Sequence, residues 1–117
     1  MSRKYPKTVL CVGKDTVDSV LEEIENINRF AYADIIELRA DYIREEELTE
    51  ENLAKINHAS DKEVIFTLRK QEEGGQRKIP DSLREAFYCT AVKIGFEYID
   101  IENSTPEDML GRIISEI

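Results

Sequence analysis

The sequence has 117 residues, of which 41% are hydrophobic and 35% are charged, and its formal net charge is −9. This length predicts one domain at most, and the acidic balance argues against nucleic acid and anionic membranes as partners, because both bind basic patches. No apolar run is long enough to cross a membrane, and residues 1–7 lack the apolar core of a signal sequence, so we expect a cytoplasmic protein.

Four apolar runs predict β-strands at residues 8–12, 34–39, 63–69 and 98–102. Each run is followed by a stretch with the periodicity of an amphipathic helix. Thr16 and Thr49 are predicted N-caps of the first two helices, and Ser82 with Glu85 has the spacing of a capping box for the third. Thr105 followed by Pro106 predicts the start of the fourth. The alternation predicts an α/β fold with a parallel sheet and right-handed crossovers.

The third predicted helix carries an apolar stripe that we expect to face the sheet. Its members are Leu83, Ala86, Phe87, Thr90, Ala91 and Ile94, and Gly95 ends the helix. Cys11 and Cys89 lie in apolar surroundings without the spacing of a metal site, so they are predicted to be buried thiols rather than a disulfide.

Charged residues stand at the ends of three predicted strands: Glu37 and Arg39, then Arg69, then Asp100 and Glu102. Residues two apart on a strand share a face, so each pair is predicted to point one way and to converge with Arg69. Carboxylates and guanidinium groups together suit a small polyhydroxylated anion. The alternative is that these charges only pair with one another at the edge of the sheet.

The segment after the third strand has the composition of an active-site loop. Arg69 ends the strand, Glu73 follows in a polar stretch, and Gly74 and Gly75 come next. Ligand sites of parallel α/β folds lie at such strand ends, so Arg69 and Glu73 are candidate site residues, with a solvated charge pair as the alternative.

A second chemical interpretation is a site for Mg²⁺ or Ca²⁺, since oxygen ligands suit both ions. Its ligands would be Glu37, Asp41, Asp100 and Glu102. Arg39 and Arg69 stand among these acids and would repel a cation, so we expect no metal site. The sequence contains no phosphate-binding glycine loop and no nucleophile elbow.

Three segments resemble a known family, the type I 3-dehydroquinate dehydratases. Residues 36–42 (IELRADY) are similar to the ELRxD motif of that family's second strand. Residues 66–69 (FTLR) with 73–75 (EGG) are similar to the third-strand motif, and residues 98–102 (YIDIE) to the YxDxE motif of the fourth. The motifs occur in family order and cover nearly the whole sequence.

The resemblance implies four βα units, which are half of a (β/α)₈ barrel, and the dehydration of 3-dehydroquinate to 3-dehydroshikimate in the shikimate pathway without a cofactor. In the family a lysine forms a Schiff base with the ketone, and a histidine moves the proton. The resemblance implies that Glu37, Arg39 and Arg69 bind the substrate. It implies that Glu73 orients the catalytic histidine.

The family's lysine and histidine lie on strands five and six, beyond the four strands predicted here. Lys70 and Lys93 stand at other positions. His58, the one histidine of the sequence, is expected at the end of the second helix and opposite the strand ends. We therefore expect the chain to be inactive alone, and to pair with a separate C-terminal half or with a second copy, because a half-barrel leaves open edges and an apolar face. The remaining alternatives are a catalytically silent binding module and a small metal-binding α/β domain.

Overall fold

A computed structural model describes residues 6–117. The prediction that there is no signal sequence concerns residues 1–7, and most of these residues lie outside the described part of the chain. Strands and helices alternate as β1 (Val9–Val12), α1 (Val17–Asn28), β2 (Ile35–Arg39), α2 (Glu50–Ala59), β3 (Glu63–Thr67), α3 (Asp81–Ile94), β4 (Tyr98–Asp100) and α4 (Glu107–Ser115). The strands form one parallel sheet in the order β1-β2-β3-β4. The predicted α/β fold of four βα units is confirmed.

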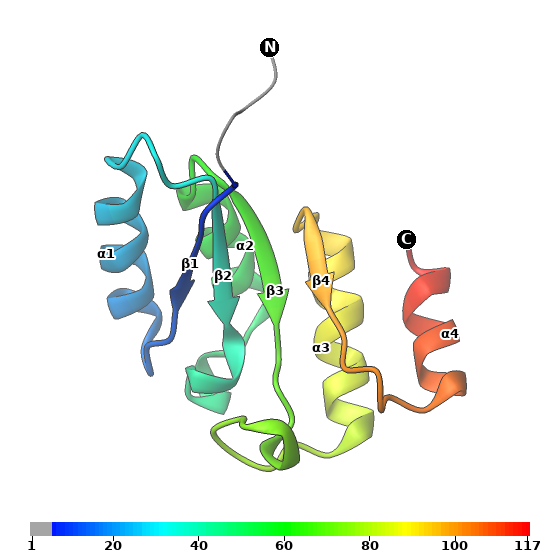
Figure 1. Ribbon diagram of the computed structural model, residues 1–117. Helices are drawn as coiled ribbons and strands as arrows, with labels where there is room; N and C mark the ends of the chain where they lie inside the picture. The colour runs from blue at the N-terminus through cyan, green and yellow to red at the C-terminus, as the bar shows by residue number, and fades with distance from the viewer. Residues whose placement is uncertain (1–5) are drawn as a thin grey trace.

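The helices cover one face of this sheet and leave the other bare (Figure 1). Val12, Leu38, Val64 and Phe66 point toward the helices and are buried in the core with the apolar stripes of α1 and α2. On the bare face the register aligns Cys11, Glu37, Ile65 and Tyr98. This face therefore carries the side chains that alternate with the core positions.

The starts of the first two helices agree with the prediction from the sequence, and the starts of the other two differ from it. Thr16 and Thr49 cap α1 and α2 as predicted. Helix α3 begins at Asp81, and the carbonyl of Pro80 accepts from the third and fourth amides that follow it, so the predicted Ser82 capping box is wrong. Helix α4 begins after Pro106, and Thr105 is buried one residue before the cap.

The face that α3 turns to the sheet also differs from the prediction. Its buried residues are Arg84, Tyr88 and Ala91, whereas Ala86 of the predicted stripe is exposed. The helix is rotated by about one residue because Arg84 has a buried acidic partner and the Tyr88 hydroxyl has carbonyl partners.

The two edges of the sheet, β1 and β4, have no strand beside them in the part of the chain that is described. Val9 and Tyr98 are 48% and 42% exposed, as expected for an open apolar face, whereas Ile35 is buried. Ile101 lines a groove between β4 and α4 on the helix side. That groove has a volume of about 470 Å³ and is lined mostly by apolar side chains, among them Val92, Phe96, Ile99, Leu110 and Ile113.

None of the helices within residues 6–117 has both the length and the apolar character needed to span a membrane.

Candidate functional site

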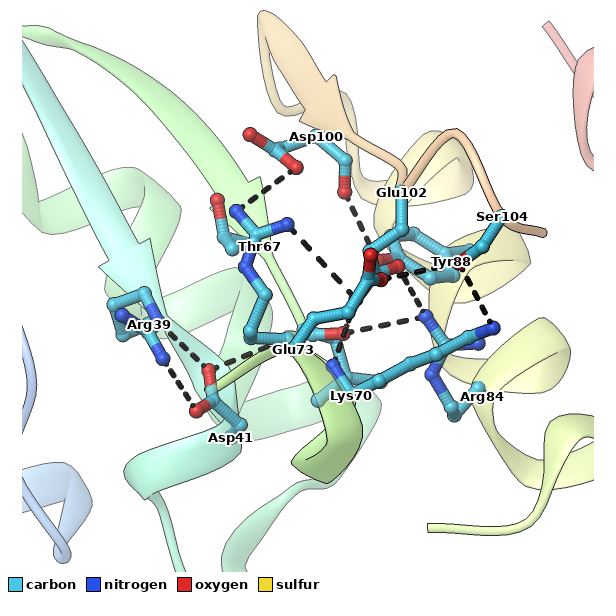
Figure 2. Close-up of polar contacts among 12 residues, drawn as sticks. Arg39, Asp41, Thr67, Lys70, Glu73, Arg84, Tyr88, Asp100, Glu102 and Ser104 are labelled. Atoms are coloured by element: carbon cyan, nitrogen blue, oxygen red, sulfur yellow. Dashed lines mark hydrogen bonds and ion pairs between the residues drawn. The ribbon is translucent and has the colours of Figure 1, made fainter. Parts of the chain in front are cut away.

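The carboxyl ends of β2, β3 and β4 bring polar side chains together at one edge of the sheet (Figure 2). Arg39 and Thr67 align with Asp100 across the three strands. All three side chains belong to the bare face, which is the face that a closed barrel turns to its interior. The expected convergence of charged residues at these strand ends is therefore present for Glu37, Arg39, Arg69 and Asp100.

Glu37 is fixed by the neighbouring strand. The Thr67 hydroxyl, on a residue that is 1% exposed, donates a 2.8 Å hydrogen bond to Glu37 Oε2. The Cys11 thiol lies on the other side of Glu37. Cys11 is exposed, so the prediction of a buried thiol is wrong for this residue, but partial desolvation together with the Glu37 carboxylate raises the pKa of the thiol. Glu37 therefore lies between Thr67 and Cys11 on the bare face of the sheet.

Arg39 lies between a carboxylate and an aromatic ring. Its Nε and a terminal nitrogen each donate a 2.9 Å hydrogen bond to Asp41, and this fork raises the pKa of Arg39. The guanidinium carbon lies 5.1 Å from the centre of the Tyr42 ring. Gly13 makes room for that ring, since a Cβ there would lie 3.1 Å from it. This arrangement gives Arg39 one fixed direction.

Arg69 reaches across to β4. One of its terminal nitrogens lies 3.2 Å from Asp100 Oδ1, and the other lies 3.9 Å from Glu102 Oε2. Its side chain is 24% exposed. Arg69 therefore keeps donors for a ligand beside the carboxylate that holds it.

Glu102 does not lie on the same face as Asp100, as the strand alternation predicted that it would. Strand β4 ends at Asp100, and past that point the chain turns, so Glu102 lies among buried residues and pairs with Arg84 of α3 at 2.5 Å. Both side chains are 2% exposed. Tyr88 donates to the carbonyl of Asp100 at 2.9 Å, and burial raises the pKa of its hydroxyl, which keeps the donor neutral.

The acids proposed for a metal ion do not gather. Among residues 6–117 no group of three or more histidine, cysteine or acidic side chains is arranged to hold one. Asp41 accepts from Arg39 and Glu102 from Arg84, and Asp100 pairs with Arg69. These acids neutralise arginines instead.

Glu73 is exposed in a single 3₁₀ turn (Gln71–Glu73), where Glu73 Oε2 accepts from the Ser104 hydroxyl at 3.1 Å. Lys70 Nζ donates to that same hydroxyl at 3.3 Å. His58 lies near the end of α2, which leads into the amino end of β3. His58 is thus at the opposite end of the sheet from Glu73, as predicted.

Sequence reasoning missed the residues that support the site. The sequence suggests Asp41 only as a metal ligand or as part of a motif, yet Asp41 is fully buried and accepts from two backbone amides besides Arg39. Arg84 is not predicted from the sequence, because a lone arginine on an amphipathic helix is usually exposed. Its signal was an i, i+4, i+7 spacing with Tyr88 and Ala91.

The arrangement has donors and acceptors for an anion that carries hydroxyl groups. Two guanidinium groups can hold a carboxylate, and Glu37 can accept from a hydroxyl. Lys70, the amine nearest these groups along the chain, is engaged with Ser104 at the rim. The described side chains at these strand ends are therefore able to bind a ligand, whereas His58 lies at the other end of the sheet.

The family model of type I 3-dehydroquinase matches residues 8–117. A 3-dehydroquinate dehydratase of Streptococcus gordonii is 33% identical over 97 residues, which are 80% of this chain and 43% of that protein. Two solved 3-dehydroquinate dehydratases share the fold over 95% of this chain. That of Enterococcus faecalis has a TM-score of 0.82 and 25% identity, and that of Clostridium difficile has a TM-score of 0.85 and 20% identity. The chain covers 48% and 46% of them, about half their length.

Proposed function

Because the chain belongs to the type I 3-dehydroquinase family, we propose that residues 1–117 act as a single N-terminal half-barrel domain that binds substrate for a 3-dehydroquinate dehydratase. The reaction is the loss of water from 3-dehydroquinate to give 3-dehydroshikimate. The observation that carries this proposal is the group formed by Glu37, Arg39 and Arg69 at one edge of the sheet. Since the two free thiols fit a reducing compartment, we place this activity in the cytoplasm.

Each site residue makes a different contact with the substrate. Arg69 and Arg39 hold the substrate carboxylate or its hydroxyls, because a guanidinium presents several donors in fixed directions. Glu37 accepts from a hydroxyl through the oxygen that Thr67 leaves open. Glu73 exchanges Ser104 for the histidine of the catalytic step, orients that ring and stabilises its charged form.

The chemistry itself needs a lysine and a histidine from a C-terminal half. The lysine amine condenses with the substrate ketone and releases water, which gives an imine. The imine withdraws electrons, so the neighbouring C–H loses its proton to the histidine. The hydroxyl then leaves as water with a proton from the same histidine, and hydrolysis of the imine frees the product.

The partner half has a place to bind. The edge of β4 offers unpaired backbone groups for a fifth parallel strand, and the apolar groove between β4 and α4 accommodates the side chains of that strand. The relatives supply the reason to name this occupant, since the chain spans about half of each solved dehydratase. We therefore propose a C-terminal half of the same family as the partner, in preference to a second copy of this chain.

A catalytically silent binding module is the second candidate. It is favoured by the position of the amines and of the imidazole, because Lys70 bonds Ser104 and His58 lies at the far end of the sheet. In that case the chain binds a hydroxy acid without transforming it.

Borohydride trapping separates the two functions. Three samples are incubated with 3-dehydroquinate and sodium borohydride. They are this chain by itself, the C-terminal half of the Streptococcus gordonii dehydratase by itself, and the mixture of the two. We expect a reduced adduct only in the mixture, on the partner's lysine, and a loss of that adduct with Arg69→Met. Glu85→Gln, a surface change, is the matched control and should leave the adduct intact.

An adduct on this chain alone would overturn the assignment of the lysine to the partner. A mixture without an adduct, made with a chain that still binds 3-dehydroshikimate in a calorimetric titration, would favour the silent binding module. Absence of both the adduct and the binding would refute the proposed function.

A further inference from the structure

Two buried carboxylates hold the junction between β3 and the loop that follows it. Asp41 comes just after β2, and Glu102 comes just after β4, so they approach β3 from its two neighbours. Asp41 Oδ1 accepts from the amide of Arg69 at 3.3 Å, and Glu102 Oε2 accepts from the amide of Lys70 at 2.7 Å. Successive amides of one strand end are therefore bound by acids from opposite sides.

Each of these acids is balanced by its own arginine. Arg39 donates twice to Asp41, which is fully buried, and Arg84 donates to Glu102, which is 6% exposed. A buried carboxylate with a charged partner and an amide partner keeps one geometry, because any departure leaves a charge unpaired away from water.

The loop after Arg69 closes on the same anchor. The amide of Gly75 donates to the carbonyl of Lys70 at 2.7 Å, and the amide of Gln76 donates to Asp41 Oδ2 at 3.3 Å. A Cβ on Gly75 would lie 2.0 Å from the Arg69 carbonyl oxygen, so the loop packs directly on the backbone of the strand end. Asp41 thus contacts both the strand end and the returning loop.

We propose that Asp41 and Glu102 are positioning residues that set the direction of the Arg69 side chain. The Arg69 guanidinium lies several bonds from its backbone, so a small rotation of the strand end moves it by a larger distance. The two acids fix that backbone from both sides, and Asp100 receives the guanidinium at 3.2 Å. This inference rests on the proposed function, in which Arg69 binds the substrate.

The first test needs no ligand. Asp41→Asn and Glu102→Gln keep the size of each side chain and remove its charge. Glu85→Gln is the control, because Glu85 accepts a similar fork from Arg112 on the surface. In amide hydrogen exchange followed by NMR, we expect Asp41→Asn to speed exchange at Gln76 at least tenfold and Glu102→Gln to do so at Lys70. The Nε–H signal of Arg69 should broaden in both variants and stay sharp in the control.

The second test is a double-mutant cycle on the binding of 3-dehydroshikimate, measured by calorimetry. We expect Asp41→Asn and Glu102→Gln each to weaken binding at least tenfold. In an Arg69→Met background the same changes should weaken it less than threefold, because the side chain that they position is gone. A purely structural role would give equal losses in both backgrounds.

Equal losses in the two backgrounds, or an Arg69 signal that neither variant changes, would overturn the positioning role. If the unaltered chain does not bind 3-dehydroshikimate, the proposed ligand is refuted. The exchange and Arg69 signals then decide the positioning role by themselves.

Discussion

The buried pair between Arg84 and Glu102 allows a quantitative prediction for Arg84→Met. Both side chains are 2% exposed, so removing the arginine leaves a carboxylate in the interior with the amide of Lys70 as its nearest remaining donor. Breaking a buried ion pair in this way costs about 3–5 kcal/mol. We expect the lower end, about 3 kcal/mol, because Arg69 still lies 3.9 Å from the carboxylate.

The assay is thermal denaturation followed by circular dichroism. For a domain of this size, a loss of about 3 kcal/mol corresponds to a fall of about 12 °C in the melting temperature. Adding Glu102→Gln to Arg84→Met removes the unpaired charge, so the double variant should be more stable than the single one. Arg112→Met, which breaks an ion pair on the surface, is the control and should shift the midpoint little.

Two results would refute this reasoning. A loss below about 1 kcal/mol for Arg84→Met would mean that the pair is solvated rather than buried. A double variant less stable than Arg84→Met would mean that the carboxylate stabilises the fold without its arginine.

Three further predictions concern single positions. Gly75→Ala should lower the free energy of unfolding, measured by urea denaturation, by at least about 1 kcal/mol, because the new Cβ would meet a carbonyl oxygen at 2.0 Å. Gly111 lies on α4 with open space around it, so Gly111→Ala should raise the free energy of unfolding by about 0.5–1 kcal/mol. The rate at which iodoacetamide alkylates Cys11, followed by mass spectrometry as a function of pH, should have its midpoint above the ordinary thiol pKa of about 8.5. Glu37→Gln should lower the pH of that midpoint. A midpoint at or below the ordinary pKa in the unaltered chain would contradict the geometry. Thr67→Val should cost about 1 kcal/mol, since it deletes the hydrogen bond to Glu37, and no change in the denaturation midpoint would argue that this bond contributes nothing.

The order and type of the elements follow from local sequence. Continuous apolar runs mark the strands, and threonine caps mark the first two helices, because these signals depend on neighbours within a few residues. The start of α3 could not be predicted in the same way. Ser82 and Glu85 have the pattern of a capping box, but the helix begins at Asp81, and the carbonyl of Pro80 accepts from the amides of Leu83 and Arg84.

The candidate site was predictable where side chains alternate on a regular strand. Glu37 and Arg39 lie on β2, and their shared face follows from the pleat. Glu102 lies past the end of β4, where alternation no longer applies, and its direction is set by an arginine 18 residues earlier in the chain. Asp41 is a similar case, since its amide partners lie just past the end of β3 and in the loop beyond it.

The order of the strands has a consequence for synthesis on the ribosome. Val9 pairs with Ile35, Ile35 with Glu63, and Ile65 with Tyr98, so each strand finds its neighbour in the segment translated just before it. Every pairing joins strands that are consecutive in the sequence, so no strand has to wait for a segment beyond the next strand. The arginines at the strand ends can therefore be set in place while the protein is still emerging from the ribosome.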